Sequence, residues 1–322
     1  MGGIPLTFDD VKEAAVRIAP HVCRTPLMTS ASLDAAAGGN VFFKCENFQH
    51  AGAFKARGAV NAVFSLDAKT AANGVATHSS GNHGAALARA AALRGIPCHV
   101  VVPKGANPVK RSAIVRYGAN VIECPPTMQG REDALADVAE RTGAHIVHPY
   151  ADYAVMAGQG TVALEVFDEV APDLLVVPLG GGGLISGSAT VAKAVSPKTQ
   201  VIGVEPAGAA DALASFRAGK VRPVDNPRTI ADGLRATVGA MNLAIIREKV
   251  DDIVTVTDAE IVTAMRLVWE RLKIVIEPSA AVGLAAVLNH AVDLRGRRAA
   301  IILTGGNADL DNLPWPDREK SE

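Results

Sequence analysis

Residues 50–59 read HAGAFKARGA and place one lysine, Lys55, among small side chains and a single aromatic ring, Phe54. Partial burial lowers the pKa of a lysine ammonium, and the neutral amine can then attack a carbonyl to form a Schiff base. A lysine at the start of a helix with its head in water is the commoner arrangement, because charged side chains are mostly exposed. The other motifs of the chain therefore decide between a reactive and a solvated Lys55.

Three further motifs follow along the chain. Residues 79–84 read SSGNHG, residues 180–183 are four glycines directly after an apolar run, and residues 304–307 read TGGN after another apolar run. A lysine, a glycine loop and nearby hydroxyl and amide groups are what a cofactor with an aldehyde, a phosphate and a ring nitrogen needs. Pyridoxal phosphate carries all three of these groups.

In these motifs the chain resembles the pyridoxal-phosphate enzymes of the tryptophan-synthase-β fold group, or fold type II, in the branch of serine/threonine dehydratases and serine racemase. The resemblance runs from residue 25 to residue 307. It implies an α/β fold of two lobes, each a parallel sheet flanked by helices. It also implies pyridoxal 5'-phosphate as the cofactor, an amino acid as the substrate and a homodimer as the assembly.

Length and composition agree with this fold and exclude several other classes. With 322 residues, 49% of them hydrophobic and 4% aromatic, the chain can form two lobes with a large core. The formal net charge of -1 provides no basic field to attract nucleic acid or an anionic membrane surface. The four cysteines form no C-x-x-C pair, which argues against zinc and disulfides and favours a cytoplasmic protein. No apolar run approaches the ~18 residues of a membrane span.

The order of the predicted elements favours two lobes. Residues 7–18 predict a helix, because Thr7 and Asp10 have capping-box spacing ahead of apolar residues at helical intervals. Strands and helices, including a helix over 107–118, then alternate from residue 74 to 149, and a second series begins with a helix at residue 158. We therefore expect a discontinuous large cofactor-binding domain (1–64 and 153–322), a small domain inserted in it (74–151), and a polar tail over 309–322.

The resemblance implies two tasks for Lys55. It holds the cofactor aldehyde as a Schiff base, with Phe54 packed beside the ring, and its freed amine removes the Cα proton of the substrate as general base. Ala53 stands where the family often has serine. This difference removes one hydrogen bond and leaves the role of Lys55 unchanged.

The glycines Gly180, Gly181, Gly182 and Gly183 follow a predicted strand and open a predicted helix. Their amides can converge on a phosphate at the helix amino terminus, and without side chains the backbone can approach it closely. A flexible turn and a dinucleotide site are the alternatives. Glu205 stands roughly 20 residues on, where an NAD site has its acid, so an oxidoreductase stays open.

The motif at residues 79–84 carries several expected contacts. Asn82 resembles the family asparagine that binds the phenolic oxygen of the cofactor. Ser80 resembles the serine of serine racemase that faces the cofactor from the side opposite the lysine, and a base on each face permits racemisation. Ser79, Asn82 and His83 suit a substrate carboxylate. A plain helix cap is the alternative for this motif.

Thr304 matches the hydroxyl residue that pairs with the pyridine nitrogen in this fold group. A neutral hydroxyl does not keep that nitrogen protonated, so the cofactor is a weaker electron sink and a carbanion with a β-leaving group should eliminate. Glu277, in the stretch IEPSA, lies in a segment similar to that of the family and is expected to face the cofactor. The alternative for Glu277 is a buried carboxylate that caps a helix.

Residues 205–211, EPAGAAD, resemble the divalent-cation loop of serine racemase, with Glu205, the Ala209 carbonyl and Asp211 as ligands. Oxygen ligands suit Mg²⁺, or alternatively Ca²⁺ or Mn²⁺, rather than zinc. Two solvated acids are the other interpretation. Arg131 matches an arginine of the smaller lobe that reaches a substrate carboxylate when the lobes close, and surface solvation is its alternative.

The expected function is that of a pyridoxal-phosphate-dependent dehydratase, with Lys55 and Ser80 as catalytic residues. It would convert a β-hydroxy amino acid (L-serine, L-threonine or 3-hydroxyaspartate) to a 2-keto acid and ammonia by α,β-elimination. A serine or aspartate-type racemase with side eliminase activity is the main alternative. β-Replacement of the cysteine-synthase type ranks lower, because GAFKARG lacks the pattern of that branch. A non-catalytic binding protein and an NAD-dependent oxidoreductase are the most distant alternatives.

Overall fold

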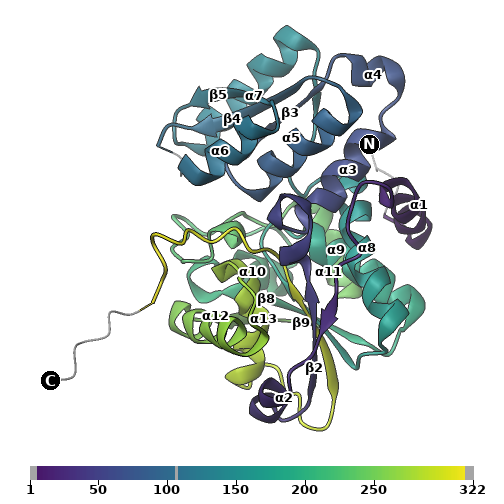
Figure 1. The fold of residues 1–322 in the computed structure, drawn as a ribbon, viewed down its shortest axis with the longest axis vertical. Helices are drawn as coiled ribbons and strands as arrows, with labels where there is room; N and C mark the ends of the chain where they lie inside the picture. The colour runs from purple at the N-terminus through teal and green to yellow at the C-terminus, as the bar shows by residue number, and fades with distance from the viewer. Residues whose placement is uncertain (1–5, 106–107, 316–322) are drawn as a thin grey trace, which may run out of the picture.

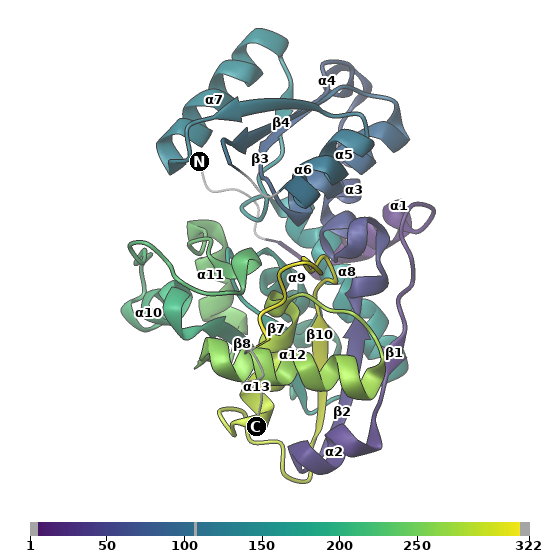
Figure 2. The same ribbon diagram turned by 60° about the vertical axis from the view of Figure 1, so that its left-hand side comes forward.

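The computed structural model describes residues 6–105 and 108–315 and contains two sheets, each covered by helices. The lobe with the smaller sheet lies at one end of the molecule and the lobe with the larger sheet at the other (Figure 1, Figure 2). This arrangement confirms the expected α/β fold. The helix predicted over residues 107–118 is α6 (Pro108–Arg116). Residue 107 and the tail after Trp315 lie outside the described residues.

The larger sheet has the strand order β1-β2-β10-β7-β8-β9, and its pairs are parallel except β1 with β2. Its strands are β1 (Leu27–Met28), β2 (Asn40–Cys45), β7 (Leu174–Pro178), β8 (Gln200–Pro206), β9 (Asp252–Val256) and β10 (Arg298–Leu303). All residues of β7 are buried, as a central parallel strand with helices on both faces requires.

Alternate residues of β7 face two different hydrophobic cores, because side chains alternate along a strand. Leu174 and Val176 pack with residues of α12 (Asp258–Leu272) and α13 (Pro278–Leu288). Leu175 and Val177 pack with residues of α1 (Phe8–Ile18), α8 (Tyr153–Glu169), α9 (Gly183–Val195) and α11 (Ala240–Lys249). The strand therefore lies between two helical layers.

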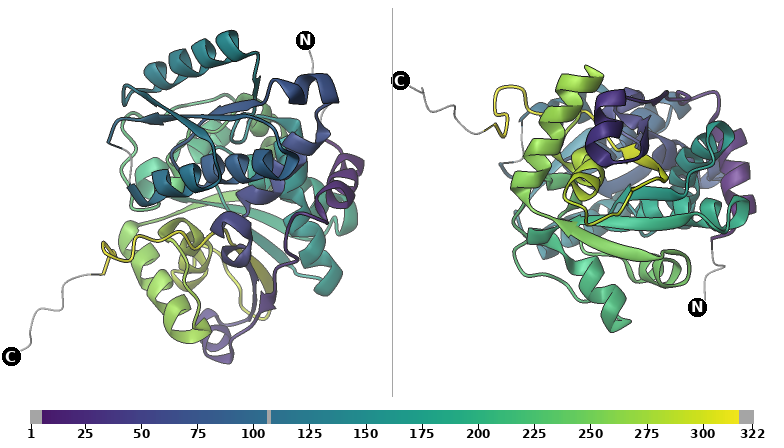
Figure 3. Two further views of the ribbon diagram at one scale, coloured as in Figure 1. Left: turned by 45° about the horizontal axis from the view of Figure 1, so that its top comes forward. Right: turned by 90° about the horizontal axis from the view of Figure 1, so that it is seen from below.

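The smaller sheet is fully parallel, with the order β5-β4-β3-β6 (Figure 3). Its strands are β3 (Val75–His78), β4 (Cys98–Pro103), β5 (Asn120–Cys124) and β6 (His145–Ile146). One core joins it to α5 (Asn82–Arg94) and α6, and a second core joins it to α7 (Met128–Thr142).

Helix α3 (Lys55–Ser65) begins with the lysine of the sequence motif and packs on α5 of the smaller lobe and α8 of the larger one. Lys55 therefore lies where the two lobes meet. The predicted domain limits stay a prediction. The remaining helices are α2 (Ala31–Ala37), α4 (Ala68–Ala72), α10 (Asp211–Ala218) and the 3₁₀ turns η1 (Glu46–Phe48), η2 (His50–Gly52), η3 (Ala207–Ala209) and η4 (Asp232–Leu234).

Side-chain caps explain where two of the helices begin. Thr7 and Asp10 form the predicted capping box, so the first helix is confirmed as α1. Helix α8 begins before the expected residue 158, because the Asp152 carboxylate accepts hydrogen bonds from the amides of Ala154 and Val155. Helices α11, α12 and α13 were not foreseen from the sequence.

Candidate active site

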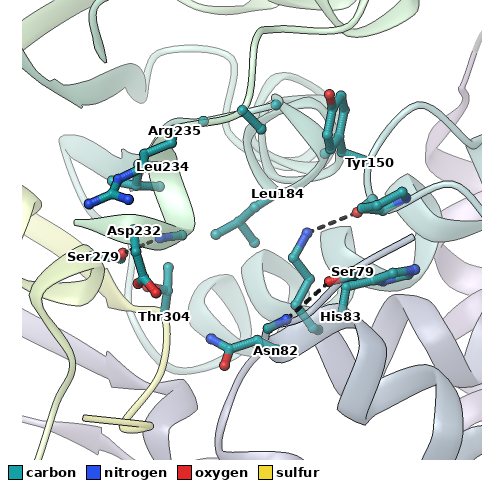
Figure 4. A pocket seen from close by; sticks show the side chains of 18 of the residues that line it. Ser79, Asn82, His83, Tyr150, Leu184, Asp232, Leu234, Arg235, Ser279 and Thr304 are labelled. Atoms are coloured by element: carbon teal, nitrogen blue, oxygen red, sulfur yellow. Dashed lines mark hydrogen bonds between the residues drawn. The ribbon is translucent and has the colours of Figure 1, made fainter. Parts of the chain in front are cut away.

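A cavity of about 390 Å³ lies between the two lobes and contains the motifs found in the sequence (Figure 4). It opens where strands of both sheets end: β7 leads to the glycine loop, β10 leads to Thr304, and β3 leads to residues 79–81. Ligands bind at the carboxyl ends of parallel strands in open α/β sheets. The topology therefore brings together segments that are far apart in the sequence.

Lys55 projects into this cavity from the amino terminus of α3. Its Nζ atom donates a hydrogen bond to the Pro149 carbonyl at 2.8 Å and lies 5.1 Å from the centre of the Phe54 ring. Burial of the amine lowers its pKa to about 8. A large fraction of this lysine is therefore neutral near pH 8, which distinguishes it from the solvated lysine considered above.

The backbone before Lys55 is fastened to the end of β10. The Phe54 amide donates to the Thr304 carbonyl at 3.0 Å, and Ala53 forms a bridge with Gly305. Gly52 has a φ of 70°, and a Cβ added to it would lie 2.3 Å from the Asn307 side chain. Only glycine fits there, so the motifs at residues 50–59 and 304–307 form one unit.

The glycine loop has the geometry predicted for it. It follows β7, α9 begins at Gly183, and Gly182 has a φ of 95°. A Cβ on Gly181 would lie 2.4 Å from the Tyr150 ring. The Gly181 carbonyl accepts a hydrogen bond from the Gly239 amide, which holds the loop from the far side. These contacts leave a buried, side-chain-free loop at a helix amino terminus, suited to an anion.

Asn82 is the first residue of α5 and makes contacts across the cavity. Its Nδ2 atom donates to Glu277 Oε1 at 2.7 Å, and its Oδ1 atom accepts from Asn307 Nδ2 at 2.9 Å. One Nδ2 hydrogen remains for a ligand. The helix-cap alternative fails, because Gly81 is the cap residue and no side chain caps the helix. Glu277 is buried and is the N-cap residue of α13, as its alternative states, but its side chain makes no capping hydrogen bond and its Oε1 atom accepts from Asn82 instead.

The other predicted contact residues of this region also line the cavity. Ser79, Ser80 and His83 lie on the wall formed by the loop after β3, whereas the buried Thr304 lies on the wall formed by the end of β10. The Thr304 hydroxyl has no hydrogen-bond partner among the residues that the structure describes. Burial and the nearby Lys55 hold the pKa of His83 well below its usual range, so its imidazole is neutral. His83 Nδ1 is buried and without a partner in the described chain.

Three further residues near Lys55 were missed in the sequence. The rings of His78 and His148 stack edge to face, and His148 contacts Tyr150 in the same way. His148 Nδ1 accepts from the Ala151 amide at 2.9 Å, and burial with nearby positive charge lowers its pKa to about 4. Both histidines lie near the carboxyl ends of predicted strands, and that position was the only signal for them.

Three more missed residues form the wall opposite Ser79 and His83, where Figure 4 shows Asp232, Arg235 and Ser279 close to Thr304. Ser279 Oγ accepts from the Gly233 amide at 3.1 Å and so holds this wall to α13. Asp232 and Arg235 belong to an irregular segment between α10 and α11, for which the sequence has no periodic pattern. No sequence signal could have identified them.

Arg131, in the first turns of α7, lines the cavity rather than a solvated surface. Its Nε atom is buried and has no hydrogen-bond partner in the described chain.

The residues of the predicted cation loop lie away from the cavity lining. Glu205 is buried at the end of β8 and accepts hydrogen bonds from the Ala212 and Leu213 amides at 3.0 and 2.8 Å. Its carboxylate therefore caps α10, and Glu205 does not line the cavity that contains the glycine loop, which removes the support for an NAD site. Asp211 is also buried and accepts from the Val238 amide at 2.7 Å. The interpretation of Glu205 and Asp211 as two solvated acids is therefore wrong.

Comparison with known proteins agrees with this geometry. The family model described as "Pyridoxal-phosphate dependent enzyme" matches residues 18–305. The beta-hydroxyaspartate dehydratase of Paracoccus denitrificans is 49% identical over 96% of this chain and 98% of its own length. The structure of maize serine racemase superposes with a TM-score of 0.94, at 45% identity over 96% of this chain and 95% of that one. The structure of the serine racemase of Dictyostelium discoideum superposes with a TM-score of 0.90, at 44% identity over 95% of this chain and 99% of that one.

Proposed function

This chain belongs to the family of pyridoxal-phosphate-dependent enzymes, and on that premise we propose that it is a dehydratase of a β-hydroxy amino acid, with 3-hydroxyaspartate as its substrate. The products are a 2-keto acid and ammonia. The observation that carries the proposal is the cavity that joins a half-buried lysine, a glycine loop at a helix start and an uncharged Thr304. The 49% identity to a beta-hydroxyaspartate dehydratase supports the choice of substrate.

The residues of the cavity fit the cofactor. Gly180 to Gly183 would hold its phosphate, Asn82 its phenolic oxygen, Thr304 its ring nitrogen and Lys55 its aldehyde, with Phe54 beside the ring and Glu277 behind Asn82. A side chain on Gly181 would fill the place where the loop turns past Tyr150, so only a glycine keeps these amides accessible. When bound, pyridoxal phosphate supplies an electron sink that stabilises negative charge at the substrate Cα.

The protein groups have separate tasks in the elimination. Lys55, with its pKa lowered to about 8, takes the Cα proton as a neutral base. The hydroxyl and amide groups of Ser79, Asn82 and His83 hold the α-carboxylate at the amino terminus of α5. Ser80 supplies the proton that leaves with the β-hydroxyl. The histidines around Lys55 are themselves neutral, so burial of the amine rather than a neighbouring positive charge keeps it unprotonated.

The decisive experiment incubates the purified holoenzyme with L-serine, L-threonine and L-threo-3-hydroxyaspartate in separate reactions. We expect 2-keto acid and ammonia in equal amounts, with the highest kcat/KM for 3-hydroxyaspartate. Absence of keto acid from all three substrates contradicts the proposal.

A racemase is the second candidate, because Lys55 and Ser80 line the same cavity and the maize serine racemase is structurally close. Two bases on opposite faces of the substrate would exchange the Cα proton with inversion. D-Serine from L-serine, lost in Ser80→Ala while keto acid persists, would identify this activity.

We propose that Glu205, the Ala209 carbonyl and Asp211 hold a divalent cation, with Mg²⁺ first and Ca²⁺ or Mn²⁺ as alternatives. Burial raises the pKa of Glu205 to about 8 and that of Asp211 to about 6, and the two negative charges repel each other. A cation would relieve this repulsion. No group of three or more metal-binding side chains occurs in the described part of the chain, so water must complete the coordination.

A cytoplasmic homodimer completes the proposal. All four cysteines are free thiols, which suits a reducing compartment. No helix among the described residues is long and apolar enough to cross a membrane. Size-exclusion chromatography with light scattering tests the dimer.

A further inference from the structure

We propose that Arg131 and Arg235 together bind the second carboxylate of a dicarboxylic substrate, and that this pair sets the preference for 3-hydroxyaspartate over L-serine. The inference rests on the proposed function and deepens it, because it assigns the substrate side chain to named residues of the same cavity. It also changes the task of Arg131, which the resemblance assigned to a substrate carboxylate without saying which one.

The guanidinium of Arg131 lacks an acceptor. Among the described residues it forms no hydrogen bond and no ion pair, and its Nε atom is buried. The side chain as a whole is half-buried, and a buried N–H such as Nε without a partner is unfavourable. The side chain nevertheless lines the cavity from the smaller lobe. An anionic group of a ligand would satisfy it.

Arg235 lines the cavity from the larger lobe. Within the described chain, its Nε and Nη2 atoms donate to a single acceptor, the Thr229 carbonyl. A guanidinium has five N–H donors in a planar fork, so others remain for a ligand. The contact to Thr229 also fixes the fork, which reduces the entropy lost when a carboxylate binds.

Binding of an amino acid with a single carboxylate does not require Arg131 or Arg235, as the other charged groups of the cavity indicate. The cations are Lys55, Arg131 and Arg235, and the acids are Asp232 and Glu277. Lys55 serves the cofactor, and Glu277 accepts from Asn82. The α-carboxylate already has the hydroxyl and amide donors at the start of α5. A second carboxylate would pair with both arginines, because the smaller lobe contributes the guanidinium of Arg131 and the larger lobe that of Arg235.

The test compares kcat/KM for L-threo-3-hydroxyaspartate and L-serine in Arg131→Met, Arg235→Met and Arg235→Lys holoenzymes. Each Met variant should lower the ratio of the two values by about 100-fold, the loss expected for a charge-assisted hydrogen-bonded pair. Arg235→Lys should lower it less, because the charge stays and the fork is lost. Arg222→Met is the matched control, since Arg222 is an exposed residue of the same irregular segment and does not line the cavity. An equal loss for both substrates, or an unchanged ratio, overturns the inference.

Calorimetric titration with succinate and butyrate, two four-carbon acids without the reactive groups, separates this inference from the proposed function. The wild-type holoenzyme should bind succinate at least 10-fold more tightly than butyrate, and both Met variants should lose that preference. If no amino acid is turned over but the preference holds, the dehydratase proposal fails and the dicarboxylate site stands. If succinate binds no better than butyrate, the inference fails whatever the enzyme catalyses. Melting temperatures of all variants confirm that a change in the ratio comes from folded protein.

Discussion

Replacing Arg57 with methionine should destabilise the protein by about 3–5 kcal/mol, since it leaves a buried charge without its partner. Arg57 is 1% exposed and donates to both carboxylate oxygens of Glu46 at 2.8 Å and to Glu165 at 2.7 and 2.9 Å. Lys44 completes the set and lies 2.6 Å from Glu165. Two positive and two negative groups thus balance within the larger lobe.

Removal of Arg57 affects the carboxylates of Glu46 and Glu165 to different extents. Glu165 keeps Lys44, whereas the fully buried Glu46 side chain keeps, among the described residues, only the hydrogen bond from the Thr25 hydroxyl at 2.6 Å. A second substitution, Glu46→Gln, should therefore restore part of the stability of Arg57→Met by removing the unpaired charge. Because α3 carries both Lys55 and Arg57, the single variant should also shift the position of the reactive amine.

Equilibrium urea denaturation measures the effect, and thermal melting should show a loss of roughly 6 °C from the entropy of unfolding of a chain of this length. Burial acts to raise the pKa of Glu165, but the hydrogen bonds and positive charges of Arg57 and Lys44 outweigh it and hold this pKa below its ordinary value. A carboxylate whose pKa is lower in the folded than in the unfolded chain stabilises the fold at pH values above its pKa in the unfolded chain. This stabilisation is lost as the pH falls, so the difference in free energy of unfolding between variant and wild type should shrink below about pH 4. A loss under about 1 kcal/mol at pH 7, or no recovery with Glu46→Gln, would refute the reasoning.

Three shorter predictions concern the cavity. Lys55→Ala should abolish both turnover and the visible absorbance of the bound cofactor, and a coloured variant would contradict the role of the lysine. Reconstitution of the apoprotein should accelerate as pH rises through about 8, because the neutral amine of Lys55 is the nucleophile, and stopped-flow absorbance checks this midpoint. Gly181→Ala should weaken cofactor binding about 100-fold by pushing the loop against Tyr150, which lies 2.4 Å from the added Cβ. In the same titration Gly95→Ala should leave binding unchanged, because its added Cβ meets no atom within 4 Å and the strain at its φ of 69° stays at the end of α5, outside the cavity lining.

Local sequence was sufficient to predict the position of a residue wherever its immediate neighbours in the chain determine that position. The glycine loop, the lysine motif and the TGGN stretch each come after an apolar strand, and parallel strands deliver the loops at their carboxyl ends to one edge of the sheet. The capping box of Thr7 and Asp10 spans one helical turn and could be predicted for the same reason. The fold class and the cavity residues that belong to these motifs were therefore predictable from one chain, whereas Asp232 and Arg235 were not.

Only the tertiary structure decided which distant groups meet. Asn82 and Glu277 are 195 residues apart in the chain and share a hydrogen bond because two sheets face each other across the cavity. Arg235 lies in an irregular segment whose path depends on contacts with Thr229, α13 and Asp211 rather than on any repeat in its own sequence. The pattern of apolar and polar residues determines the local backbone structure and which residues are buried. The pairing of side chains across the cavity depends instead on how the two lobes pack, and no short sequence motif predicts that packing.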